Sequence, residues 1–152
     1  MTAVPLKVPA LLPPWSSAAP THGTTTVSLT AQNRDGRTAH IQLQRCTVGR
    51  LRYAYPTGEH DIEIQITQGE NAPLSADLIS AVVAAIEAAE PRCRRIVLPV
   101  PVAALDDIAA AEQAGLRPVV EVDLPDAELV LLVVEPAWVR GEGGNADQVP
   151  GT

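Results

Sequence analysis

Two carboxylates, Asp61 and Glu63, stand two positions apart in a segment, residues 60–67, where polar and apolar side chains alternate. Such alternation is typical of a strand with one buried face, and residues two apart share a face. The chemistry open to adjoining carboxyl groups is proton transfer, because burial of both would raise the pKa of one of them. At the level of sequence we favour the simpler alternative, two solvated carboxylates on an exposed strand face.

The other reactive side chains predict no further centre. Cys46 and Cys93 lack the spacing of metal ligands, and we expect two buried thiols in a reducing cytoplasm rather than a disulfide. The three histidines, His22, His40 and His60, are far apart, without a second ligand at helical or hairpin spacing. We therefore expect them on the surface or on strand faces, and we expect no metal site.

The elements that would position the carboxylates follow from the hydrophobic periodicity. A period of two predicts four consecutive antiparallel strands, a meander, over residues 24–32, 37–46, 51–55 and 60–67. The period then changes, and a single apolar stripe predicts the main helix over residues 75–90. Ser75 is a plausible N-cap, and Asp77 suits the positive end of the helix dipole. Pro91 ends this helix.

The second half of the chain predicts three more strands and a second helix. Pro99 and Pro101 lie in a strand over residues 94–102 and remove N–H groups from the same edge. This strand must therefore diverge from a neighbour or lie at the sheet margin. A helix over residues 104–114 ends at Gly115, which suits a left-handed stop. Two strands follow, residues 116–124 and 127–135, and the continuously apolar second one is expected to be buried on both faces.

Composition limits the classes of partner. The 152-residue chain has one Lys and ten Arg against 18 acidic residues, for a net charge of -7. It therefore lacks the positive surface that duplex nucleic acid or an anionic membrane would attract, and we expect neither as a partner. It also lacks an apolar run of the roughly 20 residues that span a bilayer. Proline interrupts the apolar start of the chain, which argues against a signal peptide, so we expect a cytoplasmic protein.

The same reading divides the chain into three parts. Residues 1–22 form a proline-rich arm, residues 23–139 one folded domain, and residues 140–152 a disordered tail rich in Gly, Asn, Asp and Pro. Trp15 is the large apolar side chain of the arm. It could dock the arm on the domain or on a neighbouring subunit, and a partly ordered tail is the alternative.

The order of these elements resembles that of the GCN5-related N-acetyltransferases, the GNAT family. Asp61-Ile62-Glu63-Ile64 is similar to the central strand of that family and Arg94-Arg95-Ile96-Val97-Leu98 to the strand after its main helix. Glu112-Gln113-Ala114-Gly115-Leu116-Arg117-Pro118 is similar to the segment often written E-K-x-G-F-x. The resemblance implies an α+β fold with a mixed, mostly antiparallel sheet of six to seven strands and two helices. It also implies that the two central strands diverge around the pantetheine arm of acetyl-CoA.

The resemblance implies a cofactor site that departs from the family pattern. Backbone groups of the central strand would hold pantetheine, and the following loop would hold pyrophosphate through N–H groups at the start of the helix. The residues implied are Ile64, Ile66, Thr67, Gly69, Asn71, Ala72 and Ser75. However, Pro73 removes one donor, and Glu70 places a negative charge where phosphate oxygens would lie.

The catalytic groups of the family are also partly missing from this sequence. A Tyr that protonates the departing thiolate would fall at Ala111, whereas Glu63 could serve as the general base. The strand and two helices that usually form the acceptor side have no counterpart in residues 1–23. Two functions remain open: an acyl-CoA-dependent N-acyltransferase acting on a small amine, or a non-catalytic GNAT-like pseudoenzyme that binds a protein partner, for example as a homodimer. An unrelated α+β binding domain is a third alternative.

Overall fold

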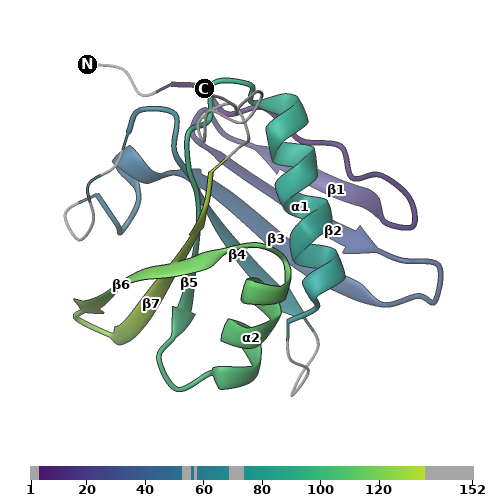
Figure 1. Cartoon of the computed structure of the whole chain (residues 1–152). Helices are drawn as coiled ribbons and strands as arrows, with labels where there is room; N and C mark the ends of the chain where they lie inside the picture. The colour runs from purple at the N-terminus through teal and green to yellow at the C-terminus, as the bar shows by residue number, and fades with distance from the viewer. Residues whose placement is uncertain (1–3, 53–55, 57, 69–73, 136–152) are drawn as a thin grey trace, which may run out of the picture.

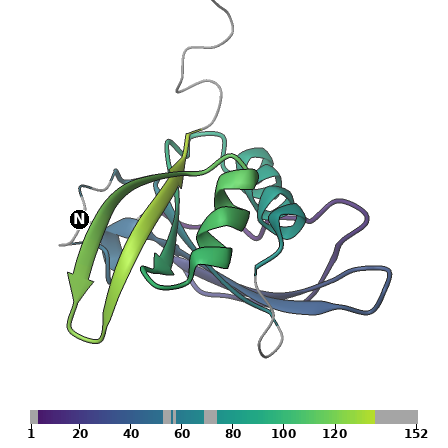
Figure 2. The ribbon, with the colours of Figure 1, turned by 60° about the horizontal axis from the view of Figure 1, so that its bottom comes forward.

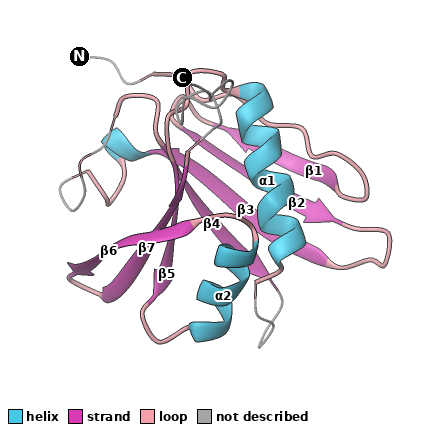
Figure 3. Cartoon of the chain, in the orientation of Figure 1, coloured by secondary structure: helices cyan, strands magenta, loops and turns pink. Residues whose placement is uncertain are grey.

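The computed structural model describes residues 4–52, 56, 58–68 and 74–135, which form one seven-stranded sheet with two helices. The strand order is β1-β2-β3-β4-β5-β7-β6, and every neighbouring pair is antiparallel except β4 and β5 (Figures 1 and 3). The strands are β1 (Ser16–His22), β2 (Thr26–Gln32), β3 (Thr38–Arg45), β4 (Ile62–Gln68), β5 (Ile96–Pro101), β6 (Arg117–Leu124) and β7 (Ala127–Val134). This confirms the expected α+β class.

The helices are α1 (Ala76–Ala89) and α2 (Leu105–Gln113), and both lie on the same face of the sheet (Figure 2). Their ends follow the sequence signals. Ser75 caps α1, its Oγ accepting a hydrogen bond from the Leu78 N–H, and Gly115 follows α2 with a φ of 98°. Neither helix in the described part of the chain is long and apolar enough to cross a membrane.

The meander contains β1 in place of the strand expected at residues 51–55. β3 pairs directly with β4, and Cys46–Val48 between them is a short 3-10 helix. Leu51 lies in a turn and is fully buried, while Tyr53 and Tyr55 fall outside the described residues. The prediction of a strand starting at Leu51 was wrong because an apolar residue that packs down onto a sheet face gives the same pattern as a half-buried strand.

The proline-rich start of the chain packs against the domain. Ser16–His22 is edge strand β1, a position where Pro20 is tolerated because one side of an edge strand needs no N–H donors. Leu6 and Trp15 are buried in the main core, with 1% and 8% of their surface exposed. Of the alternatives for Trp15, docking on the domain is therefore the one observed. The expected tail, residues 140–152, lies outside the described residues.

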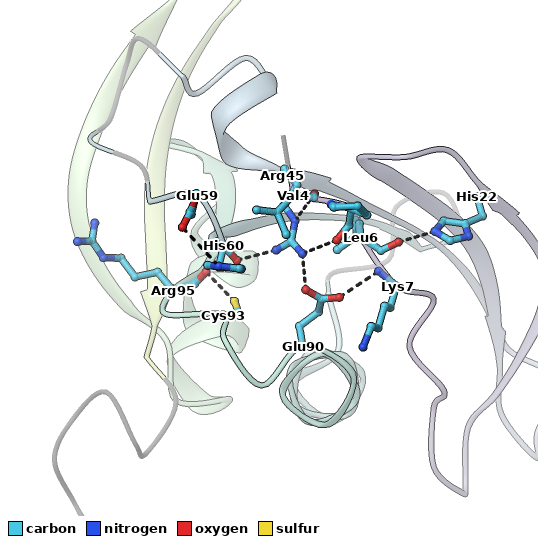
Figure 4. Close-up of polar contacts among 11 residues, drawn as sticks. Val4, Leu6, Lys7, His22, Arg45, Glu59, His60, Glu90, Cys93 and Arg95 are labelled. Carbon is cyan, nitrogen blue, oxygen red and sulfur yellow. Dashed lines mark hydrogen bonds and ion pairs between the residues drawn. The ribbon is translucent and has the colours of Figure 1, made fainter. Parts of the chain in front are cut away.

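A buried arginine, Arg45, links the chain at Val4 and Pro5 to the sheet through hydrogen bonds (Figure 4). The Arg45 guanidinium is fully buried and donates hydrogen bonds to the carbonyl oxygens of Val4 (3.0 Å), Pro5 (2.8 Å) and His60 (2.8 Å). It also pairs with the carboxylate of Glu90, directly after α1. The other Glu90 oxygen accepts the backbone N–H of Lys7 at 3.0 Å. Because both charges have several partners, the desolvation that burial imposes on them is largely offset.

Two apolar clusters lie on opposite sides of the sheet. The larger one fills the space between the helices and the sheet, and the smaller one packs the 46–52 segment against β5, β6 and β7. Strand β7 contributes to both, with Val130 and Leu132 in the larger cluster and Leu129, Leu131 and Val133 in the smaller. The expectation that this strand is buried on both faces is confirmed. Strand β7 therefore does not present an exposed apolar surface that a second subunit would have to cover.

Candidate active site

Strands β4 and β5 separate after two residue pairs. Their parallel register contains only Ile62 with Ile96 and Glu63 with Val97, whereas β5 pairs with β7 over its whole length. The Ile62 N–H donates to the Arg95 carbonyl. Alternate residues direct their backbone groups to the same strand edge, so the nitrogens of Pro99 and Pro101 also face β4, where they have no N–H to offer.

The divergence predicted from the two prolines is thus confirmed, and the other alternative, a marginal position for β5, was wrong. By the same alternation, the backbone N–H and C=O groups of Ile64 and Ile66 face the gap. A cavity of about 170 Å³ occupies it, with walls from Thr67 on β4, Leu98 and Pro99 on β5, Leu74 before α1 and Asp107 on α2. An extended chain entering this cleft could pair with β4 as an added strand would.

Glu63 lies at the apex of the cleft, at the last paired position of β4. Its side chain is 1% exposed, which contradicts the expectation of a solvated carboxylate. The Oε2 atom accepts hydrogen bonds from Arg50 Nε at 3.2 Å and Gln65 Nε2 at 3.0 Å. The Oε1 atom is buried and accepts no hydrogen bond from any residue in the described part of the chain. Glu63 therefore has one engaged oxygen and one oxygen that can receive a proton.

Asp61, also expected to be solvated, is buried as well, at 1% exposure. It precedes β4, and its Oδ2 accepts the backbone N–H of Gly58 at 2.8 Å. Burial raises the pKa of Asp61 above its usual range, although the Gly58 hydrogen bond and the nearby Arg95 guanidinium act in the opposite direction. The two carboxylates were expected on an open face, but the 46–52 segment covers them, and Cys46 N–H donates to the Asp61 carbonyl.

A second hollow adjoins Glu63 on the sheet face opposite the helices. It has a volume of about 300 Å³ and is lined mainly by polar side chains: Thr26, Gln42, Gln44, Glu63 and Gln65. Gln65 lines both this hollow and the cleft, and Arg50 lines the cleft while it holds Glu63. Glu63 and its two partners thus lie between the cleft and the hollow, so that two adjoining cavities meet at one buried carboxylate.

The start of α1 is the remaining part of the predicted cofactor site. Gly69, Asn71 and Ala72 lie outside the described residues. At Leu74 and Ser75, the backbone N–H groups are already engaged by the chain itself. Leu74 N–H donates to Asp107 Oδ1 at 2.9 Å, and Ser75 N–H donates to Gln68 Oε1 at 2.6 Å.

The alternative catalytic groups are missing or buried. Ala111 is fully buried within the main core and has no side-chain proton to donate. Cys46 and Cys93 are free and buried, as predicted. Burial raises the pKa of Cys93 to about 12 and that of Cys46 further still, which leaves neither as a thiolate nucleophile at neutral pH. Within residues 4–52, 56, 58–68 and 74–135, no group of three or more His, Cys, Asp or Glu side chains could hold a metal ion.

Sequence reasoning missed three residues of this site: Arg50, Gln65 and Asp107. The Glu63–Gln65 spacing places both side chains on one face of β4, and that signal was available. The contacts of Arg50 and Asp107 depend on how the 46–52 segment and α2 pack, which no local pattern reports.

Comparison with solved structures identifies the fold. An uncharacterized protein from Bacillus halodurans shares 22% identity, with a TM-score of 0.65 over 78% of this chain and 63% of that one. The aminoglycoside acetyltransferase AAC(6')-Ib, solved with ribostamycin and coenzyme A, shares 17% identity, with a TM-score of 0.66 over 80% of this chain and 70% of that one. The spermidine N-acetyltransferase SpeG from Vibrio cholerae shares 10% identity, with a TM-score of 0.58 over 78% and 70%.

These likenesses show that the chain has the fold of the GCN5-related N-acetyltransferases, as the order of its elements predicted. A fold unrelated to that family, the third alternative, is thereby excluded. At identities below 25% the similarity concerns the fold, and the chain spans 63% of the Bacillus halodurans protein. No protein-family model and no curated protein sequence matches the chain.

Proposed function

We propose that the protein is an acyl-CoA-dependent N-acyltransferase that acts on a small amine. The observation that carries this proposal is the cleft between β4 and β5, with Glu63 at its apex and a polar hollow beyond. The pantetheine arm would lie along β4 and pair with the backbone groups of Ile64 and Ile66, and the acceptor would enter from the hollow. Coenzyme A in solved structures of the same fold supports the choice of donor.

The residues support a simple reaction. The amine nitrogen attacks the thioester carbonyl, a C–N bond forms, and the C–S bond breaks. Glu63 would take the proton of the amine on Oε1, while Arg50 and Gln65 hold Oε2 and so fix the orientation of the carboxylate. With Ala111 at the position of the usual acid, the departing thiolate would take its proton from water.

Calorimetric titration with acetyl-CoA and coenzyme A tests the donor half of this proposal. Binding at micromolar Kd, about 8 kcal/mol, is the expected result. Thr67→Trp fills the mouth of the cleft and should weaken binding about tenfold or more. Thr30→Trp is the matched control. Thr30 pairs with His40, and His40 pairs with Thr67, so Thr30 lies on the same sheet face as Thr67 but two strands further from the cleft.

A non-catalytic interaction module is the second candidate. The occupied N–H groups at the start of α1 and the buried Ala111 favour it, since both features remove parts of the usual chemistry. A second copy of the chain or another protein would then be the partner, meeting exposed apolar side chains such as Leu105 and Val119. The absence of heat and of a thermal shift with either coenzyme would favour this candidate. A monodisperse monomer at micromolar concentration would count against the homodimer.

A further inference from the structure

Side chains of the protein accept three backbone N–H groups at and just before the start of α1. Asp107 Oδ1 accepts the Leu74 N–H, Gln68 Oε1 accepts the Ser75 N–H, and Ser75 Oγ accepts the Leu78 N–H at 3.3 Å. These N–H groups, together with the positive end of the helix dipole, are what a helix start offers to a phosphate. One of the three acceptors is an anion, so a negative charge from α2 already occupies this end of α1.

Asp107 also lines the cleft, together with Ile66, Thr67 and Leu74. It therefore stands where an extended ligand would leave the space between β4 and β5 and pass the start of α1. A phosphate at this point would have to displace the Asp107 carboxylate from Leu74 and would still lie beside it. An uncharged pantetheine arm within the cleft would meet neither obstacle.

We propose that Asp107 lowers the affinity of the donor site for coenzyme A, by repelling its phosphate-bearing part while leaving the binding of the pantetheine arm unaffected. This inference rests on the proposed function, because it assumes that the cleft is the donor site. The chemical distinction is between a thioester carrier with phosphates and one without them. Repulsion between the carboxylate and the phosphate, rather than a steric block, is the physical cause.

Three variants separate charge from structure. Asp107→Asn removes the charge and keeps an oxygen that can accept the Leu74 N–H, whereas Asp107→Ala removes both. Asp106→Asn is the matched control, because Asp106 is exposed and lies in the same first turn of α2. It changes the net charge of the chain by the same amount at the neighbouring position.

The affinities of coenzyme A and of pantetheine are measured by calorimetry for the wild type and the three variants. We expect Asp107→Asn and Asp107→Ala to bind coenzyme A about tenfold more tightly, and Asp106→Asn to change affinity less than about twofold. Pantetheine affinity should stay within about twofold of the wild type, and the gain for coenzyme A should shrink in about 1 M salt, where charges are screened within about 3 Å. Circular dichroism verifies that each variant is folded.

If the wild type and Asp107→Asn bind coenzyme A with equal affinity, and pantetheine also binds in its own titration, the role of Asp107 is overturned and the proposed function still stands. An equal gain in Asp106→Asn would also overturn it, because a general charge effect would then explain the data. If neither ligand binds the wild type or any variant, the cleft is not a donor site, and the proposed function and this inference both fail.

Discussion

Replacing Arg45 with alanine should destabilise the fold more than any exposed arginine replacement. The change leaves three carbonyl oxygens, those of Val4, Pro5 and His60, without their donor. It also leaves the Glu90 carboxylate buried, with the Lys7 N–H as its remaining donor in the described part of the chain. Removing one partner of a buried ion pair costs about 3–5 kcal/mol. For a domain whose total stability is about 5–15 kcal/mol, that is a large fraction, and Tm should fall by roughly 8–16 °C.

Urea denaturation followed by circular dichroism measures this loss. Arg37→Ala is the matched control, because Arg37 is exposed just before β3, and its replacement should change stability by no more than about 0.5 kcal/mol. The double variant Arg45→Met, Glu90→Leu should lose less than Arg45→Ala, since it leaves no uncompensated charge. A loss below about 1 kcal/mol for Arg45→Ala, or a double variant less stable than the single one, would refute the reasoning.

Two further predictions concern the carboxylates. Glu63→Gln should lower kcat about 100-fold or more while the Kd for acetyl-CoA stays nearly constant, as a steady-state assay paired with calorimetry can measure; unchanged turnover would remove Glu63 from the chemistry. Asp61→Asn should stabilise the fold at neutral pH and not below the ordinary pKa of an aspartate. The raised pKa of Asp61 means that the folded state holds the proton more tightly than the unfolded state. Wild-type stability therefore falls as pH rises from the ordinary pKa of an aspartate to the higher pKa of Asp61 in the folded state. Denaturation at several pH values measures the difference, and a gain that does not vary with pH would contradict this cause.

The sequence was most informative where covalent structure dictates geometry. Pro99 and Pro101 lack N–H groups whatever surrounds them, so these two residues restricted β5 to divergence from a neighbour or a place at the sheet margin, and the first alternative is the one observed. Ser75 and Gly115 likewise mark the ends of helices through local hydrogen bonding and backbone conformation. Such features need no knowledge of what packs against them.

The sequence was least informative where a distant segment decides the environment. Asp61 and Glu63 were predicted to be solvated because nothing local indicates that the 46–52 segment folds over them. Leu51 was predicted to begin a strand because nothing local indicates how this segment packs. The period of two places Arg45 on the buried face of β3 with Ile41 and Leu43, but no local pattern shows that the partner of its charge is Glu90, 45 positions away. Contacts of this range are set by tertiary packing, which periodicity does not record.

The proline pair of β5 has a consequence for the energetics of ligand entry. A strand with a full set of N–H groups at these positions could close onto β4, and any ligand would then have to break sheet hydrogen bonds before it could enter. Because the prolines cannot donate, the backbone groups of Ile64 and Ile66 remain available and the cleft is open in the free protein. An incoming chain therefore meets a preorganised half-site, and its affinity is not reduced by the free energy of opening the sheet.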